Sequence, residues 1–323
     1  MNKSFVRSLT VSAAIALGCA IIAGYQLLGT SRDYENYIFY FSYLLQSDNG
    51  LDLAYRFEPG FSLFVYLFGL VTSSPQAIYG LIVWVIVFLK YLSIPPARGY
   101  WLAILVFSFY FFSRYFVLFE MTVLRAACAF SLAFFVFARR ENEEVELSAV
   151  LLLALAAAFH YSAVVFLLVY FAKNLTRSRV VILAVACFGA ITISKNYMLS
   201  VLPEFFSVFE TYDGVGQATL VPIPYLVDLI YFLLMLGLWS RSDAAMKYCA
   251  LGVAIGAAFH FSLVEHSVLA SRFRELLSMF FLVYVVRASI SASPLVRCTS
   301  LVYALTTGLM NMYLVFVHDP LLS

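Results

Sequence analysis

Long apolar runs separated by short polar segments fill almost the whole chain. The first run extends from Leu9 to Leu28 and follows two basic residues, Lys3 and Arg7. A helix of about 20 apolar residues is long enough to cross the hydrocarbon core of a bilayer. Because no small-x-small cleavage site follows it, we interpret this run as a membrane span rather than a removed signal peptide. The pattern predicts an all-α, polytopic membrane protein with about nine to eleven membrane segments in a single domain, residues 1–323.

The composition excludes an ordinary soluble globule. Of the 323 residues, 63% are hydrophobic and 12% are charged, whereas soluble domains carry roughly 25% charged residues. The 20 basic and 18 acidic residues nearly cancel, so the chain has no basic surface for a nucleic acid. The five cysteines stand singly in apolar surroundings, so the sequence predicts neither a disulfide nor a metal site.

Basic residues in short loops mark the cytoplasmic side of a membrane protein. On this rule the main outer loops are residues of about 30–57 and 197–222, with shorter turns near 113–120 and 265–274. Both long loops are rich in acidic residues, which agrees with an outer position. The cations assigned to the inner side are Lys3, Arg7, Lys90, Arg98, Arg139, Arg140, Lys173, Arg177, Arg179, Arg241, Lys247, Arg287 and Arg297.

Two segments do not fit a simple alternation of full spans. Residues 57–93 are interrupted by the polar run Thr72–Pro75, and residues 147–171 should both start and end on the inner side. At about 1.5 Å per residue, the second segment is too short to cross twice. We therefore predict a re-entrant half-helix in each, since irregular backbone is tolerated where it is buried in protein or lines a wet cavity. The alternative for 147–171 is one tilted span that breaks the charge rule.

A six-residue pattern occurs twice, at Ala157–Ser162 and at Ala257–Ser262. Each copy contains one histidine, His160 or His260. The repeat indicates two similar helix ends. Chance similarity is the alternative in a chain this rich in alanine and phenylalanine.

Ionisable side chains at membrane depth are costly unless they are paired or hydrated, so they are candidates for function. The topology places most of them at or just below the outer face. In the alternative interpretation several merely form ion pairs, such as Glu120 with Arg125 or Glu265 with Arg272. The group comprises Asp33, Arg56, Glu58, Arg114, Glu120, Arg125, His160, His260, Glu265, His266, Arg272 and Arg274.

The cations of this outer group are all arginines, and the chain has 15 arginines to 5 lysines. A guanidinium group donates two parallel hydrogen bonds to a phosphate and keeps its charge when buried. The arginines at the outer face therefore predict binding of a lipid-linked diphosphate. The alternative is that arginine is simply the basic residue preferred by the genome.

Five short motifs follow one another along the chain. They are Arg32-Asp33-Tyr34-x-x-Tyr37, Glu58-Pro59-Gly60-Phe61, Leu124-Arg125-Ala126, Phe159-His160-Tyr161-Ser162-Ala163 and Arg272-Phe273-Arg274-Glu275. In this order they resemble the EpsG-like group of bacterial exopolysaccharide and O-antigen polymerases of the Wzy type. Over residues of about 30–165 the resemblance rests on these motifs. Over the remainder of the chain it rests on the pattern of apolar segments. One departure is that Ala126 and Ala127 follow Arg125 where the group usually has a glutamine.

The resemblance implies a metal-independent glycosyltransferase in the bacterial inner membrane, with its active site facing the periplasm. Such an enzyme joins oligosaccharide repeat units carried on undecaprenyl diphosphate, which serve as donor and acceptor. It needs no cofactor, and its expected partners are membrane lipids and a chain-length regulator protein. The residues agree independently, because the sequence has no nucleotide-binding loop and its acidic residues are too scattered for a magnesium cage.

A base near the outer mouth must accept the proton of the acceptor hydroxyl. The candidates are His160, Glu58 and Asp33. Histidine is favoured because its ordinary pKa lies nearest neutrality, and the alternative for His160 is a structural histidine bound to a backbone carbonyl. Pro59 in a first helical turn places Glu58 at or near the N-cap, so capping alone is the alternative for Glu58.

The remaining candidates are assigned to binding. Arg125, predicted about four residues inside its span, is assigned to the diphosphate together with Arg272 and Arg274 across the mouth. Tyr34 and Tyr37 share one face if the outer loop is a short helix, where their rings can stack on sugars. The alternative for both tyrosines is anchoring at the membrane interface.

Other classes of function remain open at this point. A transporter or flippase of a lipid-linked or anionic glycan also uses broken helices and a buried polar site, although its charges should be reachable from both faces. A membrane acyltransferase with His160 as its base is a third candidate, without an evident second catalytic partner. A structural membrane subunit is the fourth.

Overall fold

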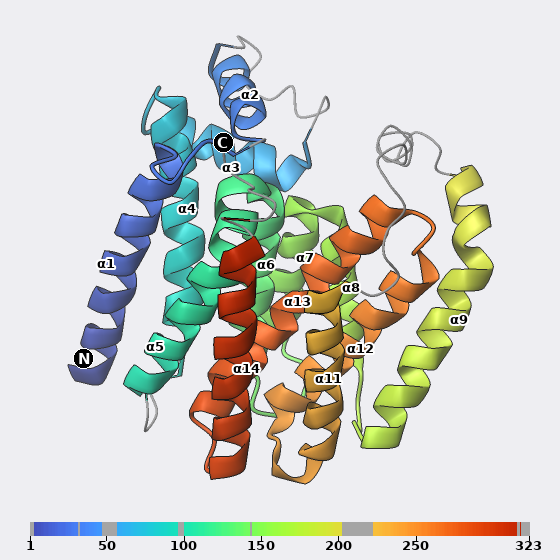
Figure 1. The fold of residues 1–323 in the computed structure, drawn as a ribbon. Coiled ribbons are helices and arrows are strands. Elements are labelled where there is room, and N and C mark those ends of the chain that lie inside the picture. Colours follow the sequence, from blue (N-terminus) through green and yellow to red (C-terminus); the bar gives the residue numbers. More distant parts are fainter. Residues whose placement is uncertain are drawn as a thin grey trace.

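The chain forms a bundle of long helices, with two short helices, α2 (Tyr34–Gln46) and α3 (Pro59–Gly69), across one end (Figure 1). The computed structural model describes residues 3–31, 33–46, 57–95, 100–142, 144–201, 222–314 and 317. The other main helices are α1 (Lys3–Gly24), α4 (Pro75–Leu92), α5 (Tyr100–Tyr110), η1 (Phe111–Thr122), α6 (Leu124–Ala138), α7 (Leu147–Phe159), α8 (Val165–Phe171), α9 (Arg177–Val201), α11 (Ile223–Gly237), α12 (Ala244–Ser262), α13 (Ser267–Ser289) and α14 (Pro294–Tyr313).

Five helical segments are long and apolar enough to cross a membrane. They are Val6–Gly24, Pro75–Leu92, Tyr100–Thr122, Arg177–Lys195 and Ala244–Ser262. Helices α13 and α14 are also long, with 23 and 20 residues, and five shorter apolar segments accompany them. The prediction of an all-α polytopic membrane protein is confirmed for the described residues.

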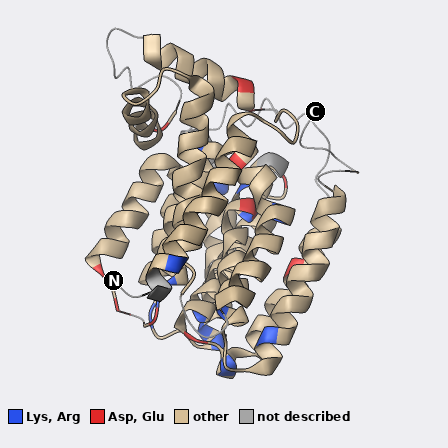
Figure 2. Ribbon diagram, turned by 90° about the vertical axis from the view of Figure 1, so that its left-hand side faces the viewer, with Lys and Arg blue, Asp and Glu red and all other residues tan. Residues whose placement is uncertain are grey.

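One end of the bundle is basic, and we call it the basic end (Figure 2). There Arg287 of α13 donates to Asp243, the N-cap of α12, at 2.7 Å and to the carbonyl of Ala138, the last residue of α6, at 3.3 Å. Arg139 donates to the carbonyl of Leu92, the last residue of α4, at 2.8 Å. The ends of four helices therefore meet where many of the cations predicted for the inner side lie.

The segment 147–171 turns back on itself, as predicted. The backbone N–H of Glu146, just before α7, donates to the hydroxyl of Tyr170, near the end of α8, at 3.0 Å. Between the two arms His160 takes an extended conformation (φ −158°, ψ 112°), and a short 3₁₀-helix, η2 (Tyr161–Val164), follows it. Both feet of this hairpin lie on the same side, and His160 lies at its tip.

The predicted interruption of residues 57–93 is also present, since α3 ends at Gly69 and α4 begins at Pro75. Ser74 caps α4 by accepting a hydrogen bond from the N–H of Ala77 at 3.4 Å. Helix α3 packs against α2, α4 and α7. This packing places the residues just before α3 beside the tip of the hairpin.

The turn predicted near 113–120 is wrong, and the turn predicted near 265–274 is shorter than expected. Residues 113–120 belong to η1, a π-helix that continues α5, and the chain leaves helical geometry only at Val123 (φ −111°, ψ 61°). The charges in this stretch, Arg114 and Glu120, bind partners inside the bundle, so they do not mark a loop. The chain turns at residues 263–266, between α12 and α13, but residues 267–274 are already helical because α13 begins at Ser267. Because the break between η1 and α6 lies at Val123, Arg125 is the second residue of α6 and not about four residues inside its span.

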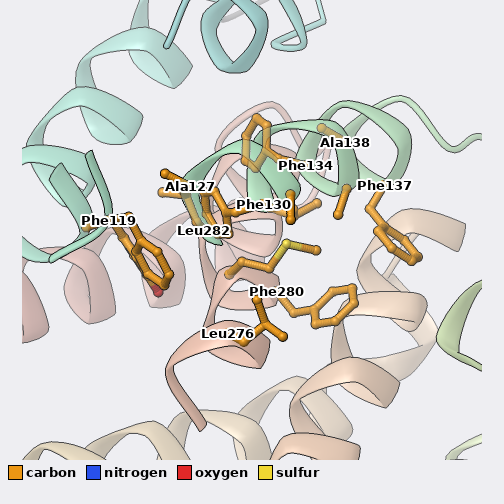
Figure 3. Close-up of a cluster of buried hydrophobic side chains, with 14 of the residues drawn as sticks. Phe119, Ala127, Phe130, Phe134, Phe137, Ala138, Leu276, Phe280 and Leu282 are labelled. Carbon is orange, nitrogen blue, oxygen red and sulfur yellow. The ribbon is translucent and has the colours of Figure 1, made fainter. Parts of the chain in front are cut away.

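Aromatic packing around α6 holds the centre of the bundle together (Figure 3). The rings of Phe119 and Phe130 stack 5.2 Å apart, and Phe137 meets Phe280 of α13 edge to face at 4.9 Å. Gly252 of α12 allows this approach, because a Cβ there would lie 2.1 Å from the ring of Phe280. The core thus fixes α6, with Arg125 in its first turn, against α13.

Candidate functional site

Three of the predicted site residues form one cluster. The carboxylate of Glu58 accepts a hydrogen bond from Nη1 of Arg125 at Oε2 (2.5 Å), and its Oε1 lies 2.9 Å from Nδ1 of His160. The three residues are far apart in the sequence, since Arg125 follows Glu58 by 67 positions and His160 follows it by 102. The fold therefore assembles this site from three separate segments.

Local geometry explains why the side chain of Glu58 can bind Arg125 and His160 instead of capping α3. Glu58 is extended (φ −60°, ψ 144°) before Pro59, and its side chain makes no capping hydrogen bond to α3. Capping therefore does not account for Glu58. Gly60 lets the start of α3 approach the hairpin tip, since a Cβ there would lie 2.7 Å from the carbonyl oxygen of Ala158. The Pro-Gly pair after Glu58 thus sets both its direction and its distance from His160.

Burial differs within the cluster. The side chain of Glu58 is 6% exposed, whereas those of Arg125 and His160 are 26% and 25% exposed. The guanidinium of Arg125 also lies over the ring of Phe57, 4.5 Å from its centre. The carboxylate is therefore covered by its two partners, which themselves reach the surface of the site.

Glu58 lies outside the five long spans and is held as a carboxylate. Burial raises its pKa, but the hydrogen bond with His160 and the positive charge of Arg125 lower it to about 2. A group with this pKa is a weak base and no proton donor at neutral pH. The side chain that can take a proton here is His160, whose Nδ1 is oriented by Glu58 so that Nε2 can accept.

Asp33, Tyr34 and Tyr37 lie around α2, beside this cluster. Tyr34 donates its hydroxyl to the carbonyl of Gly24 at 2.6 Å, which ties α2 to α1. The ring of Tyr37 is 3% exposed and stacks on Phe57 at 5.5 Å. Asp33 is partly exposed and precedes α2. Both tyrosines therefore have structural contacts, and their binding of sugars stays a prediction, as does a catalytic role for Asp33.

Arg272 and Arg274 lie in the first turns of α13, and their partners differ from those of Arg125. The guanidinium of Arg274 lies over the ring of Tyr225, 5.5 Å from its centre. Glu275 interacts electrostatically with both arginines. The binding of a diphosphate by Arg272 and Arg274 together with Arg125 therefore stays a prediction.

Sequence reasoning missed two buried ion pairs. Arg114 and Asp228 form a bidentate pair with N to O distances of 2.9 and 2.5 Å, and Lys90 pairs with Glu120. Lys90 was expected as a loop cation, which is wrong, because its side chain is fully buried in α4. Asp228 could have been found, since it is the only charge in the apolar run Ile223–Gly237.

The pairings considered in the alternative interpretation are also wrong. Glu120 binds Lys90 rather than Arg125. Glu265 binds Lys195 at 2.6 Å rather than Arg272. The reason is the same for both: each acidic side chain pairs with a lysine from a helix distant in the sequence, Lys90 of α4 or Lys195 of α9. The sequence pattern does not reveal such a partner.

The two histidines of the repeated hexapeptide have different surroundings. His260 lies inside the continuous helix α12, is 2% exposed, and has its ring 4.5 Å from that of Tyr225. His160 interrupts a helix and is partly exposed. The similar sequences therefore do not produce similar sites. Within the residues described, no group of three or more His, Cys, Asp or Glu side chains is arranged to hold a metal ion.

Comparison with known proteins identifies the family. The sequence model of the EpsG family matches residues 10–319, which is nearly the whole chain. The chain belongs to the EpsG family. Membership in EpsG supports a multi-pass membrane protein with a function of the exopolysaccharide polymerase type. Neither the curated proteins nor the solved structures compared with this EpsG chain give a match.

Proposed function

We propose that this EpsG protein is a membrane glycosyltransferase that polymerises oligosaccharide repeat units linked to undecaprenyl diphosphate, without a metal ion, on the periplasmic side of the bacterial inner membrane. The observation that carries the proposal is the carboxylate of Glu58 held between Arg125 and His160 at the hairpin tip. A base oriented by a carboxylate, beside a partly exposed arginine, is what transfer from a diphosphate-linked donor requires.

His160 acts on the acceptor. Its Nε2 takes the proton of the acceptor hydroxyl as the oxygen attacks the anomeric carbon of the donor. Glu58 accepts the hydrogen bond from Nδ1 and stabilises the imidazolium that forms, as the carboxylate does in a Ser-His-Asp triad. Because Glu58 touches His160 and not the substrate, it is a positioning residue in this scheme.

Arginines act on the donor. As the glycosidic bond forms, the bond between the anomeric carbon and the diphosphate oxygen breaks, and negative charge accumulates on the lipid diphosphate. Arg125, with Arg272 and Arg274, stabilises this charge through charge-assisted hydrogen bonds. The remaining assignments of the proposal are Asp33 as a second candidate base, Tyr34 and Tyr37 as sugar contacts, and a chain-length regulator as partner.

The test is a deletion strain restored with variants of the gene. We expect the strain to lose long polymer while single repeat units are still exported, and the wild-type gene to restore the polymer. Glu58→Gln, which removes the negative charge between Arg125 and His160, should restore little polymer although the protein reaches the membrane. Loss of export in the deletion strain would instead indicate a flippase and contradict the proposal.

A further inference from the structure

An apolar groove lies away from the Glu58 cluster, between α9, α11 and α12. Its volume is about 570 Å³, within the range of roughly 300–1,000 Å³ of small-ligand sites. All of its lining residues are apolar, and they include Ala184, Val185 and Phe188 of α9, Phe232 of α11 and Phe261 of α12. A groove with this lining suits a hydrocarbon chain and offers nothing to bind a sugar.

The groove is open sideways, toward the lipid. Two lining residues on α9 are exposed, Val185 by 64% and Phe188 by 41%. Helix α9 stands at the edge of the bundle, with α12 beside it (Figure 1). Because both helices contain candidate membrane spans, a chain already dissolved in the membrane can enter the groove without passing through water.

One end of the groove leads to positive charge. Phe261 lines the groove, and its ring lies 5.9 Å from that of Tyr225. On Tyr225 lies the guanidinium of Arg274, 5.5 Å from the ring centre. Asp228 also acts on Tyr225, but it is paired with Arg114. Among the described residues that interact here, this leaves Arg272 and Arg274 against the carboxylate of Glu275. The apolar lining and the excess cation fit an amphiphile with a hydrocarbon tail and an anionic head.

We propose that this groove holds the isoprenoid chain of the polyprenyl diphosphate substrate, with the diphosphate at Arg274. The proposal rests on the proposed function for the identity of the lipid, and it adds where that lipid is bound. A diphosphate carries more charge in a smaller volume than a phosphodiester head, and the planar guanidinium group matches it better. The groove is therefore assigned to the substrate lipid rather than to bulk phospholipid.

The experiment is photo-crosslinking of the full chain in phospholipid nanodiscs. The probe is undecaprenyl diphosphate with a diazirine at its terminal isoprene unit, and the labelled peptides are mapped by mass spectrometry. We expect labelling on the groove faces of α9 and α12. A tenfold excess of unlabelled undecaprenyl diphosphate should remove most of it, whereas the same excess of phosphatidylglycerol should not.

Two alanines of α9 provide a matched pair of variants. Ala184→Trp fills the groove and should reduce labelling by about tenfold. Ala186→Trp adds the same bulk at an exposed position outside the groove and should leave labelling unchanged. Arg274→Gln should weaken binding of undecaprenyl diphosphate by about tenfold without changing that of undecaprenol, since a charge-assisted hydrogen bond is lost.

Competition by phosphatidylglycerol as strong as by undecaprenyl diphosphate would overturn the proposal, because the groove would then hold bulk lipid. Labelling that survives Ala184→Trp would also overturn it. Failure of the proposed function looks different: the groove would be labelled as expected, but the same preparation would not extend lipid-linked repeat units. Active polymerisation without labelling of the groove would refute the groove alone.

Discussion

His160 and Glu58 lie 102 positions apart in the sequence, yet Nδ1 of the histidine is 2.9 Å from Oε1 of the carboxylate. Helix α3 and the hairpin of α7 and α8 meet at this contact, so it joins two segments that do not fit a simple alternation of spans. A carboxylate that fixes one imidazole nitrogen leaves the other to exchange protons with substrate. The proposed proton transfer depends on this pair.

The two histidines of the hexapeptide repeat give the first prediction. His160→Ala should abolish polymer formation, whereas His260→Ala should leave most of it, because His260 is buried inside α12 against Tyr225. Polymer length on gels, with both variants at equal membrane levels, measures the difference. His160→Gln separates a base from a hydrogen-bonding residue, since glutamine accepts no proton at neutral pH. Restored activity in that variant would assign proton transfer to another group.

Arg125 gives a second prediction, which separates geometry from charge. Arg125→Lys keeps the positive charge beside Glu58 but loses the planar fork, so polymerisation should fall by about tenfold to a hundredfold. This follows from the loss of one charge-assisted hydrogen bond of roughly 1.5–3 kcal/mol at the transition state. Rates of polymer formation with equal amounts of inserted protein test it. Nearly full activity would show that Arg125 acts only through its charge and that its role toward the diphosphate is wrong.

Gly60 gives a third prediction, because it controls the distance between Glu58 and the hairpin tip. In Gly60→Ala the new Cβ would lie 2.7 Å from the carbonyl oxygen of Ala158, so α3 must move away from α7. Overpacking of this kind costs about 1–3 kcal/mol, and polymer formation should fall strongly. Gly18→Ala in α1 is the control, since no atom lies within 4 Å of its Cβ. Equal activity of the two variants would contradict the proposed contact between α3 and the hairpin.

Much of this arrangement could be predicted from the sequence, for identifiable reasons. The charges around residues 147–171 require both ends on one side, and the segment is too short for two crossings, so a hairpin with His160 at its tip follows from length and charge. Glu58 and Arg125 were found because ionisable residues at membrane depth are costly. Packing of α3 on α7 brings Glu58 to His160, and packing of α6 on α7 brings Arg125 there. No local pattern specifies either contact.

The missed features share one cause. The pairs of Arg114 with Asp228 and of Lys90 with Glu120 connect positions 114 and 30 residues apart, so neither charge reveals its partner in the sequence. The charges of Arg114 and Glu120 suggested a turn and that of Lys90 suggested a loop, but residues 113–120 belong to the π-helix η1 and Lys90 lies in α4. When two opposite charges pair inside the bundle, both residues can lie within helices. A hydropathy pattern alone would predict a loop at such charged positions.

Membrane orientation gives a fourth prediction. In a chain whose native cysteines are replaced by serine, Leu70→Cys at the α3 end should react with an impermeant thiol reagent added to the periplasm. Glu144→Cys at the basic end should not react until the membrane is opened. Both positions are exposed, so accessibility in the fold is matched. The reverse pattern would place the Glu58 cluster toward the cytoplasm and overturn the periplasmic assignment.

The most direct measurement is polymerisation by the purified full chain in nanodiscs, with undecaprenyl-diphosphate-linked repeat units as the only substrate and EDTA present. We expect a ladder of lengthening lipid-linked glycans, with one undecaprenyl diphosphate released for each bond formed, and no ladder with His160→Ala. A strict requirement for a divalent ion would contradict the arginine mechanism. Wild-type protein that binds the substrate but forms no ladder would contradict the assignment of this chain as a polymerase.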